Sequence, residues 1–353
     1  MPLYPYIQFL RYSLTGETPL PESSGLIEWQ KMLIWAEQQA IVGIIYGGIV
    51  RAGKAITMPF ETLMEWIGFA QQIEIQNRLI NRKCVEVVKE YNGQGLACMV
   101  LKGQGNAQYY PEPLRRTPGD IDLLIANNVE REGITQYVIS SKQVTGGHFH
   151  HIEYNEDGIQ IEVHYFACSQ NNPIYMRRLN EWLEARATPI SVILSETEGA
   201  IFVPSWEYNV VYQLAHMMHH FFDEGIGLRQ MIDYYYLLKS EGRSQMEDFE
   251  ATLRYLGLWK FAGAVMYIMK EVLGLDEQYL IALVDEKRGK TLLNEILKGG
   301  NFGHSSNLDQ NNVAKKYLQK TWRNLQFASE YPAEALCEPV FRTWHFLWRI
   351  WNK

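Results

Sequence analysis

Cysteine is scarce in this sequence. Among 353 residues there are only four cysteines, at positions 84, 98, 168 and 337, and no two of them form a C-x-x-C pair. Zinc knuckles and disulfide frameworks both depend on regularly spaced cysteines, so neither is indicated. Reduced thiols are typical of the cytoplasm, where we expect this protein to reside.

Long hydrophobic runs are also missing. The longest weakly polar run, 41–50, contains three glycines and ends at Arg51, well short of the ~20 residues that a membrane helix needs. The first sixteen residues lack the basic region, apolar region and cleavage site of an export signal. We therefore expect a soluble protein without membrane contact.

An excess of basic residues is absent as well. The chain has 33 basic and 40 acidic residues, which gives a net charge of −7. No uniform positive field is available to attract a polyanion, so we expect no stable binding of nucleic acid. With 47% hydrophobic and 21% charged residues, the composition is that of a globular protein.

The apolar pattern changes twice along the chain. Residues 26–50 and 59–91 carry apolar side chains at steps of three and four, which is typical of helices. Three short β-rich runs then follow at 96–101, 121–125 and 159–163. After Pro204 the helical period returns and persists.

This order predicts an α+β protein in which a small mixed β-sheet core is inserted between helical regions. We expect an N-terminal helical region at 1–94, an α/β core at 95–200 and a C-terminal helical domain at 201–353.

Two aspartates stand at the start of the second predicted strand. Asp120 and Asp122 are two residues apart, so their side chains leave the same face of the strand and can converge on one cation. Glu162 alternates with apolar residues on the third strand and is a candidate third carboxylate. Such a group of hard oxygen donors suits Mg²⁺, which completes its coordination shell with water and phosphate oxygens.

Groups suited to phosphate lie close by in the sequence. Lys102 and Gly103 end the first strand, and the glycine leaves the backbone open to a phosphate. Arg115 and Arg116 precede the aspartates and can neutralise a triphosphate. The simpler alternative is that Asp120 is a turn residue and that Asp122 and Glu162 are ordinary polar strand positions.

This constellation resembles the DNA-polymerase-β type of nucleotidyltransferase. More narrowly, the segments LKG, YYPEPLRRTPGDIDLLI, HFHHIEY and IEVHY are similar to a bacterial family of uncharacterised nucleotidyltransferase-like proteins. The match is strong over residues 96–166 and extends to the helical segment that begins at Tyr208. The resemblance implies that the 95–200 core has the nucleotidyltransferase fold.

The resemblance also implies roles for individual residues. Asp120, Asp122 and Glu162 would be the catalytic, metal-binding acids, and Lys102 and Gly103 would contact the nucleotide. The cofactor would be Mg²⁺, or Mn²⁺ in its place, and the reaction would join a nucleoside monophosphate from a nucleoside triphosphate to a hydroxyl on a small molecule or a protein.

Two further nucleotide contacts are expected at Gln104 and Arg116. Gln104 departs from the family pattern, because a serine or glycine is usual there. A catalytically degenerate nucleotide-binding or regulatory module of the same fold therefore stays open as the alternative. A helical scaffold with an accidental pair of aspartates is the third hypothesis, and it predicts acids that lie apart.

Histidines gather near the acids in the sequence. Strand alternation puts His148 and His150 on one face and His151 on the other, which argues against a zinc site. His150 and His164 are candidates to orient a carboxylate or to contact substrate. A second set at positions 216, 219 and 220 shares one helix face, where packing is the expected role.

Overall fold

A five-stranded mixed sheet lies at the centre of one half of the molecule. The computed structural model describes residues 3–125, 131–241, 249–301 and 313–351. The strand order is β1-β2-β5-β4-β3, and β2 pairs in parallel with β5 while the other pairs are antiparallel. The bounds are β1 Cys98–Leu101, β2 Ile121–Ile125, β3 Val144–Gly147, β4 His151–Glu156 and β5 Ile159–His164. The predicted α+β class is confirmed.

A separate two-stranded sheet adjoins β1. Its strands, β6 Pro189–Ile193 and β7 Ala200–Pro204, form an antiparallel hairpin. The sequence predicted neither this hairpin nor β3, and it placed 148–151 on a strand, whereas β4 begins only at His151. Their burial is too irregular for a simple alternating pattern, since four of the five residues of β6 are exposed.

Alternation along the strands gives the main sheet two different faces. On β2, Ile121 and Leu123 pack into a core with α4 Phe60–Gly93 and α6 Arg131–Ser141. Asp122 lies between them in the sequence and therefore leaves the opposite face. Ile161 and Val163 on β5 repeat the pattern, so Glu162 shares the face of Asp122.

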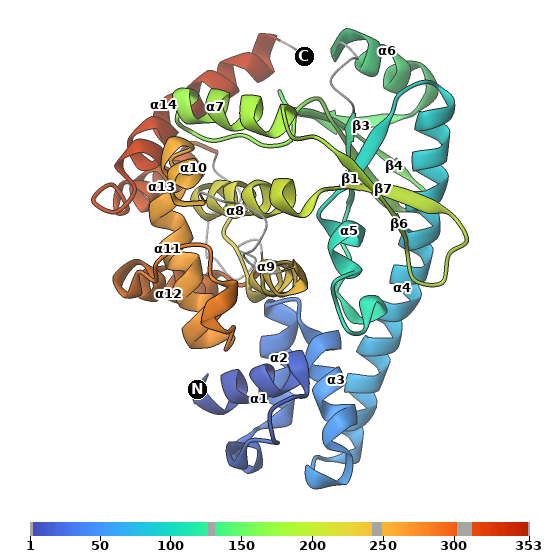
Figure 1. The fold of residues 1–353 in the computed structure, drawn as a ribbon, viewed down its shortest axis with the longest axis vertical. Helices are drawn as coiled ribbons and strands as arrows, with labels where there is room; N and C mark the ends of the chain where they lie inside the picture. The colour runs from blue at the N-terminus through green and yellow to red at the C-terminus, as the bar shows by residue number, and fades with distance from the viewer. Residues whose placement is uncertain (1–2, 126–130, 242–248, 302–312, 352–353) are drawn as a thin grey trace.

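Helix α4 connects the sheet to the N-terminal helices. It begins after Pro59, whose fixed φ suits a helix start, and it contacts both α3 Val42–Ala52 and β1. The chain reverses after Gly93 through Gly95, which has φ +77, a conformation that glycine adopts without strain. Figure 1 shows α4 running along the side of the molecule from the N-terminal helices to the sheet.

Most of the remaining helices lie on the other side of the molecule from α4 (Figure 1), whereas the short α5 lies beside β1 and α4. One large hydrophobic core contains side chains from both ends of the chain, including Trp29, Trp66, Tyr208 and Phe261. The helices not yet named are α1 Leu3–Thr15, α2 Trp29–Gln38, α5 Gly103–Ala107, α7 Pro173–Glu184, α8 Trp206–Asp223, α9 Leu228–Glu241, α10 Phe249–Tyr255, α11 Trp259–Tyr267, α12 Glu286–Gly299, α13 Val313–Leu325 and α14 Pro332–Trp351.

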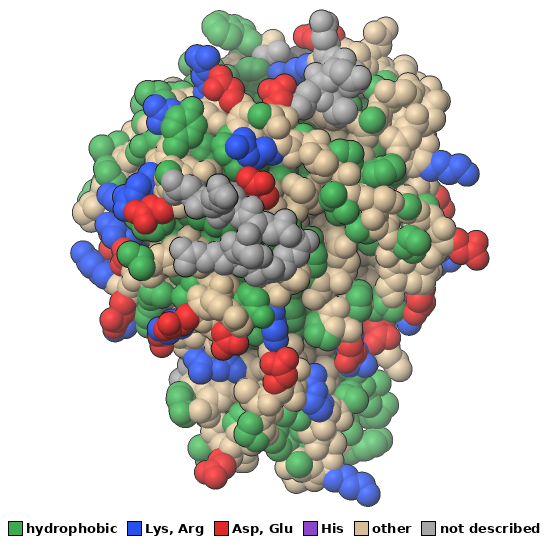
Figure 2. Space-filling model, in the orientation of Figure 1, with side chains coloured by type: hydrophobic (Ala, Val, Ile, Leu, Met, Phe, Trp, Pro, Cys, Tyr) green, Lys and Arg blue, Asp and Glu red, His purple; other side chains and the backbone are tan. Residues whose placement is uncertain are grey.

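None of the described helices combines the length and the apolar character that a membrane crossing would take. On the face shown in Figure 2, acidic and basic side chains are intermingled rather than separated into areas of one sign.

A buried glutamate joins α14 to the start of α7. The carboxylate of Glu334 accepts hydrogen bonds from the backbone N–H groups of Asn171 at 2.8 Å and Asn172 at 3.4 Å. Asn172 in turn caps α7, because its side chain accepts from the N–H groups of Ile174 and Tyr175. Burial raises the pKa of Glu334 to about 7, although the two backbone hydrogen bonds lower it.

The raised pKa of Glu334 predicts a pH-dependent stability. Between the unfolded and folded pKa values the folded state binds more protons, so stability falls as the pH rises from 5 to 8, by roughly 2–3 kcal/mol. The variant Glu334→Gln should lose this slope. Urea unfolding at several pH values measures it, with the exposed Glu61→Gln as the control; an unchanged slope in Glu334→Gln would contradict the assignment.

Candidate active site

A cleft of about 480 Å³ opens on the polar face of the main sheet. Its lining comes from the turn after β1, from β2, β4 and β5, and from α8, α9 and α14. Asp120, Asp122 and Glu162 all line it together with Gly103. The three acids expected from the sequence therefore lie in one cleft, and the scaffold hypothesis, which needs them apart, loses its basis.

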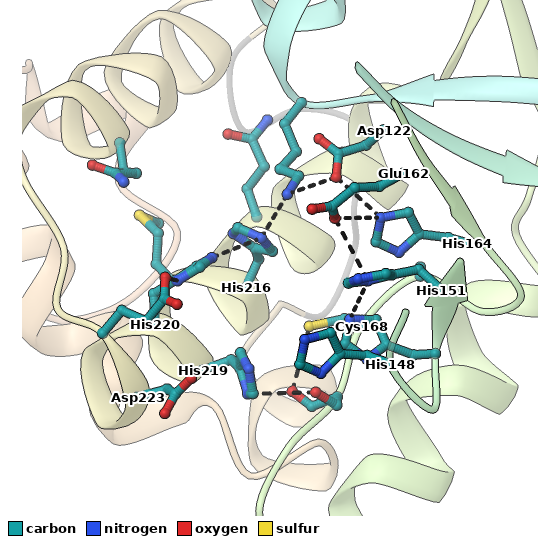
Figure 3. A pocket seen from close by; sticks show the side chains of 18 of the residues that line it. Asp122, His148, His151, Glu162, His164, Cys168, His216, His219, His220 and Asp223 are labelled. Carbon is teal, nitrogen blue, oxygen red and sulfur yellow. Dashed lines mark hydrogen bonds and ion pairs between the residues drawn. The ribbon is translucent and has the colours of Figure 1, made fainter. Parts of the chain in front are cut away.

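The pairing of β2 with β5 brings two of the acids together. Asp122 stands opposite Glu162 in the parallel register. Side chains in register on neighbouring strands leave the same face, so both carboxylates project into the cleft, as Figure 3 shows. Asp120 lies one residue before the first residue of β2 and reaches the cleft from the strand entrance.

Asp122 is buried and has two close partners. Its Oδ1 lies 3.0 Å from Lys102 Nζ and 3.0 Å from His164 Nε2. Burial alone would raise the pKa of this carboxyl, but the Lys102 ammonium and the His164 hydrogen bond lower it well below its usual range. Burial and the Lys102 charge lower the pKa of His164, but its hydrogen bonds to Asp122 and Glu162 outweigh them and raise it. Asp122 is therefore ionised in the folded protein.

Asp120 has the opposite electrostatic character. The negative charge of Asp122 and burial raise the pKa of Asp120 to about 6, while Lys102 opposes the shift. Two carboxylates at short range in a poorly solvated cleft repel each other, and a bound cation would remove this repulsion. The raised pKa of Asp120 therefore shows that the negative charge in this part of the cleft is not fully balanced.

Glu162 is placed between two histidines. Its Oε2 lies 3.5 Å from His164 Nε2 and 3.5 Å from His151 Nδ1. Burial raises the pKa of Glu162, but the His164 hydrogen bond and the charges of His151 and Lys102 together outweigh it, and the net shift is downward. Glu162 is therefore held as a carboxylate.

The turn after β1 has an unusual backbone. Lys102 has φ +42 and Gly103 has φ +39. Positive φ costs a non-glycine residue free energy, and such residues cluster where a side chain must be held in place. The Lys102 ammonium is held between Asp122 and His216, whose Nε2 lies 2.8 Å from Nζ. A Cβ on Gly103 would lie only 3.4 Å from the Asp120 carbonyl oxygen.

Gln104 and Arg116, both expected to contact the nucleotide, have partners within the protein. Gln104 is buried, and its amide donates to Asn77 and Asn81 on α4 rather than lining the cleft. Arg116 lines the cleft, but its guanidinium forms a bidentate ion pair with Asp233 on α9 at 2.7 and 2.8 Å. The structure thus gives both side chains a packing role that the sequence did not reveal.

Histidines are concentrated in the cleft to an unexpected degree. The chain has nine histidines, and His304 lies outside the described residues. All the others line the cleft: His148, His150, His151, His164, His216, His219, His220 and His345. Burial lowers the pKa of His151 to about 4 and the pKa of His219 to about 4, so both rings are neutral at pH 7.

The expectation that alternation would separate the histidines is wrong. Strand β4 begins only at His151, so His148 and His150 lie in the turn that precedes it, where alternation does not apply. His216, His219 and His220 were expected to serve in packing, but their helix α8 presents them to the cleft. Their shared face on one helix was the sequence feature that could have indicated this.

Arg229 on α9 is a further cleft residue. Its spacing of four residues from Asp233 favours a helix pair, with a role in a substrate pocket as the less favoured alternative. It lines the cleft near Asp120, and its Nη1 donates to the carbonyl oxygens of Thr117 and Pro118 at 3.3 and 3.4 Å. Arg229 therefore adds positive charge beside the acids.

Potential metal ligands form three groups within the described part of the chain. In each group, one ligand atom per residue lies within 4.8 Å of the others: Asp122 with Glu162 and His164, His150 with His151 and His164, and His151 with Glu153 and Glu162. Asp120 joins no such group of three among the described residues, although it lines the same cleft.

A mixed sheet with acids on adjacent strands beside a lysine–glycine turn defines a nucleotidyltransferase-like α+β protein. The family model described as "Uncharacterised nucleotidyltransferase" matches residues 26–274. The chain therefore belongs to the uncharacterised nucleotidyltransferase family.

Comparison with individual solved structures adds a distant likeness. A solved structure of an antigenic nucleotidyltransferase-like protein from Paracoccidioides brasiliensis is 10% identical, with a TM-score of 0.39. The likeness covers 59% of this chain and 94% of that chain. No curated protein matches.

The buried ion pair of Arg116 and Asp233 predicts a stability effect. Arg116→Met would leave the Asp233 carboxylate buried without its cation, which costs about 3–5 kcal/mol. Adding Asp233→Asn should recover part of the loss. Urea unfolding measures both; a stable Arg116→Met protein with weakened nucleotide binding would instead show that Arg116 acts on the ligand.

The two aspartates should respond differently to loss of charge in the absence of divalent metal. Asp122→Asn breaks a buried contact with Lys102 and should lower the free energy of unfolding by roughly 2–4 kcal/mol. Asp120→Asn removes a like charge and should leave the stability unchanged or raise it by about 1 kcal/mol. Thermal unfolding in a chelator compares the variants, and an Asp122→Asn protein more stable than wild type would refute this assignment.

Proposed function

We propose that this protein is a metal-dependent nucleotidyltransferase that moves a nucleoside monophosphate from a nucleoside triphosphate to a hydroxyl on a small molecule or a protein. The observation that carries the proposal is the placement of Asp120, Asp122 and Glu162 in one cleft beside the Lys102–Gly103 turn. Family membership supports the class of reaction, and the cleft supplies the residues.

The donor set fits a divalent cation with a preference for oxygen. Asp122 and Glu162 are ionised and stand opposite each other in the parallel register. The negative charge of Asp122 and burial destabilise the ionised form of Asp120, and added positive charge would stabilise it. Carboxylate oxygens of this kind hold Mg²⁺, or Mn²⁺ in its place. When bound, the ion supplies charge neutralisation for the triphosphate and the leaving pyrophosphate.

The side chains around the acids have distinct tasks. Lys102 and Arg229 bring positive charge to the side of the cleft where Asp120 lies, and they would pair with phosphate oxygens. Helix α5 has only five residues, so phosphate binding rests on these side chains and the open backbone at Gly103. Glu162, with its lowered pKa, is better suited to hold a cation than to take a proton.

The dimensions of the cleft favour a small acceptor. Its volume of about 480 Å³ lies within the usual range of ~300–1,000 Å³ for small-molecule sites. A nucleotide would fill much of this space, which leaves room for one hydroxyl-bearing group rather than for a nucleic-acid duplex. The net charge of −7 agrees with that choice.

A nucleotide-binding module without catalysis is the second candidate. Asp122 already has Lys102 and His164 as partners. Its negative charge is therefore partly balanced without a bound metal ion, which a non-catalytic module would not need. Turnover separates the two candidates.

Asp122→Asn should abolish pyrophosphate release with Mg²⁺ and nucleoside triphosphate across a panel of hydroxyl acceptors. The change keeps the size of the side chain and removes a metal-binding charge. The transition state is then less stabilised, and the rate should fall by at least about a hundredfold. The matched control is Asp276→Asn, an exposed aspartate outside the cleft, which should retain the wild-type rate.

Magnesium-dependent binding without turnover on any acceptor would favour the non-catalytic module. Equal release of pyrophosphate by wild type and Asp122→Asn would remove the acids from the mechanism altogether.

A further inference from the structure

Three histidines of the cleft form a compact group beside Glu162. One ring nitrogen from each of His150, His151 and His164 lies within 4.8 Å of the other two. His151 stands opposite His164 in the antiparallel register of β4 and β5, and His150 directly precedes β4. The sheet itself therefore fixes two of the rings side by side.

One nitrogen of each ring already has a polar neighbour within the protein. His150 Nε2 lies 3.1 Å from His151 Nδ1, and Glu162 Oε2 lies 3.5 Å from both His151 Nδ1 and His164 Nε2. His164 Nε2 also lies 3.0 Å from Asp122 Oδ1. Figure 3 shows Glu162 beside the rings of His151 and His164.

Hydrogen bonding within the protein accounts for only one nitrogen in each ring. His150 Nδ1, His151 Nε2 and His164 Nδ1 are buried without a partner. Burying three imidazoles in this state costs free energy, because each unpaired polar atom loses its hydration. A bound cation would compensate for that cost, whereas packing alone would be served equally well by apolar rings.

We infer that His150, His151 and His164 bind a first-row transition-metal ion of the zinc type through these unpartnered nitrogens, with water as the fourth ligand. Three imidazole nitrogens and one water form a donor set that Zn²⁺ accepts in tetrahedral geometry, while Mg²⁺ prefers oxygen atoms alone. This site is distinct from the oxygen site of Asp120 and Asp122. His164 connects the two, because its Nε2 lies 3.0 Å from Asp122 Oδ1, and a carboxylate on the second nitrogen of a metal-bound histidine fixes the orientation of the ring.

The contact between His164 and Asp122 would place two cations in the same cleft. In two-metal sites such a pair acts on the attacking and the leaving oxygen of one displacement. If the protein has the proposed function, the cation at the histidine site would act on the acceptor hydroxyl and the cation at the aspartate site would act on the triphosphate. This assignment of roles rests on the proposed function, but the binding of a transition metal does not.

Metal titration of the full-length chain tests the inference. After treatment with a chelator, the wild-type protein should bind about one Zn²⁺ per chain, with excess Mg²⁺ unable to displace it. Loss of a group that merely orients a ligand weakens metal binding about 10–100-fold, so loss of a ligand in His150→Gln or His151→Gln should weaken it more than about 100-fold. The control is His219→Gln, a cleft histidine whose ring contacts Ser169 instead, and it should bind Zn²⁺ as the wild type does.

The absorption spectrum of bound Co²⁺ gives a second readout that does not depend on any variant folding. A tetrahedral spectrum in the wild type supports the site, and an octahedral spectrum or none overturns it. Equal loss of Zn²⁺ in His219→Gln and His151→Gln also overturns it.

Magnesium-dependent binding of a non-hydrolysable triphosphate, measured on zinc-free protein, separates this inference from the proposed function. Nucleotide binding without zinc binding overturns the histidine site alone, and zinc binding without nucleotide binding overturns the proposed function alone.

Discussion

The side-by-side placement of Asp122 and Glu162 on parallel strands is the constraint on which the site depends. Register fixes the pair, and the sheet has no freedom to separate two side chains that leave the same face of neighbouring strands. Their negative charge must be balanced in a cleft with little water. Lys102 and His164 provide part of that balance, and Asp120, with its raised pKa, shows that the balance is incomplete.

The rest of the fold supports this arrangement. The apolar residues that alternate with the acids pack against α4 and α6 and anchor β2 and β5. Helices α8 and α9 close the opposite side and bring histidines and Arg229 to the cleft. Because one hydrophobic core includes residues from both ends of the chain, the cleft is bounded by segments that lie far apart in the sequence.

The sequence predicted the local features of the site better than its long-range contacts. β2 was predicted with its observed bounds, since a buried apolar run with an embedded acid has few other interpretations. The gathering of Asp120, Asp122 and Glu162 followed from side-chain alternation. The partners of Gln104 and Arg116 could not be foreseen, because Asn81 and Asp233 come from helices whose packing no local pattern specifies. Among the cleft histidines, His150 and His164 were expected near the acids. The histidines of α8 were expected in packing instead, because no local pattern specifies how α8 packs against the sheet.

The most direct measurement of the central claim is a crystal structure of the protein with Mn²⁺ and a non-hydrolysable nucleoside triphosphate, with the ion located by anomalous scattering. The account predicts an ion bound by Asp120, Asp122 and Glu162, with the triphosphate extending toward Lys102 and Arg229. A nucleotide bound elsewhere, or a cleft with Mn²⁺ absent from the three acids at saturating concentration, would contradict it.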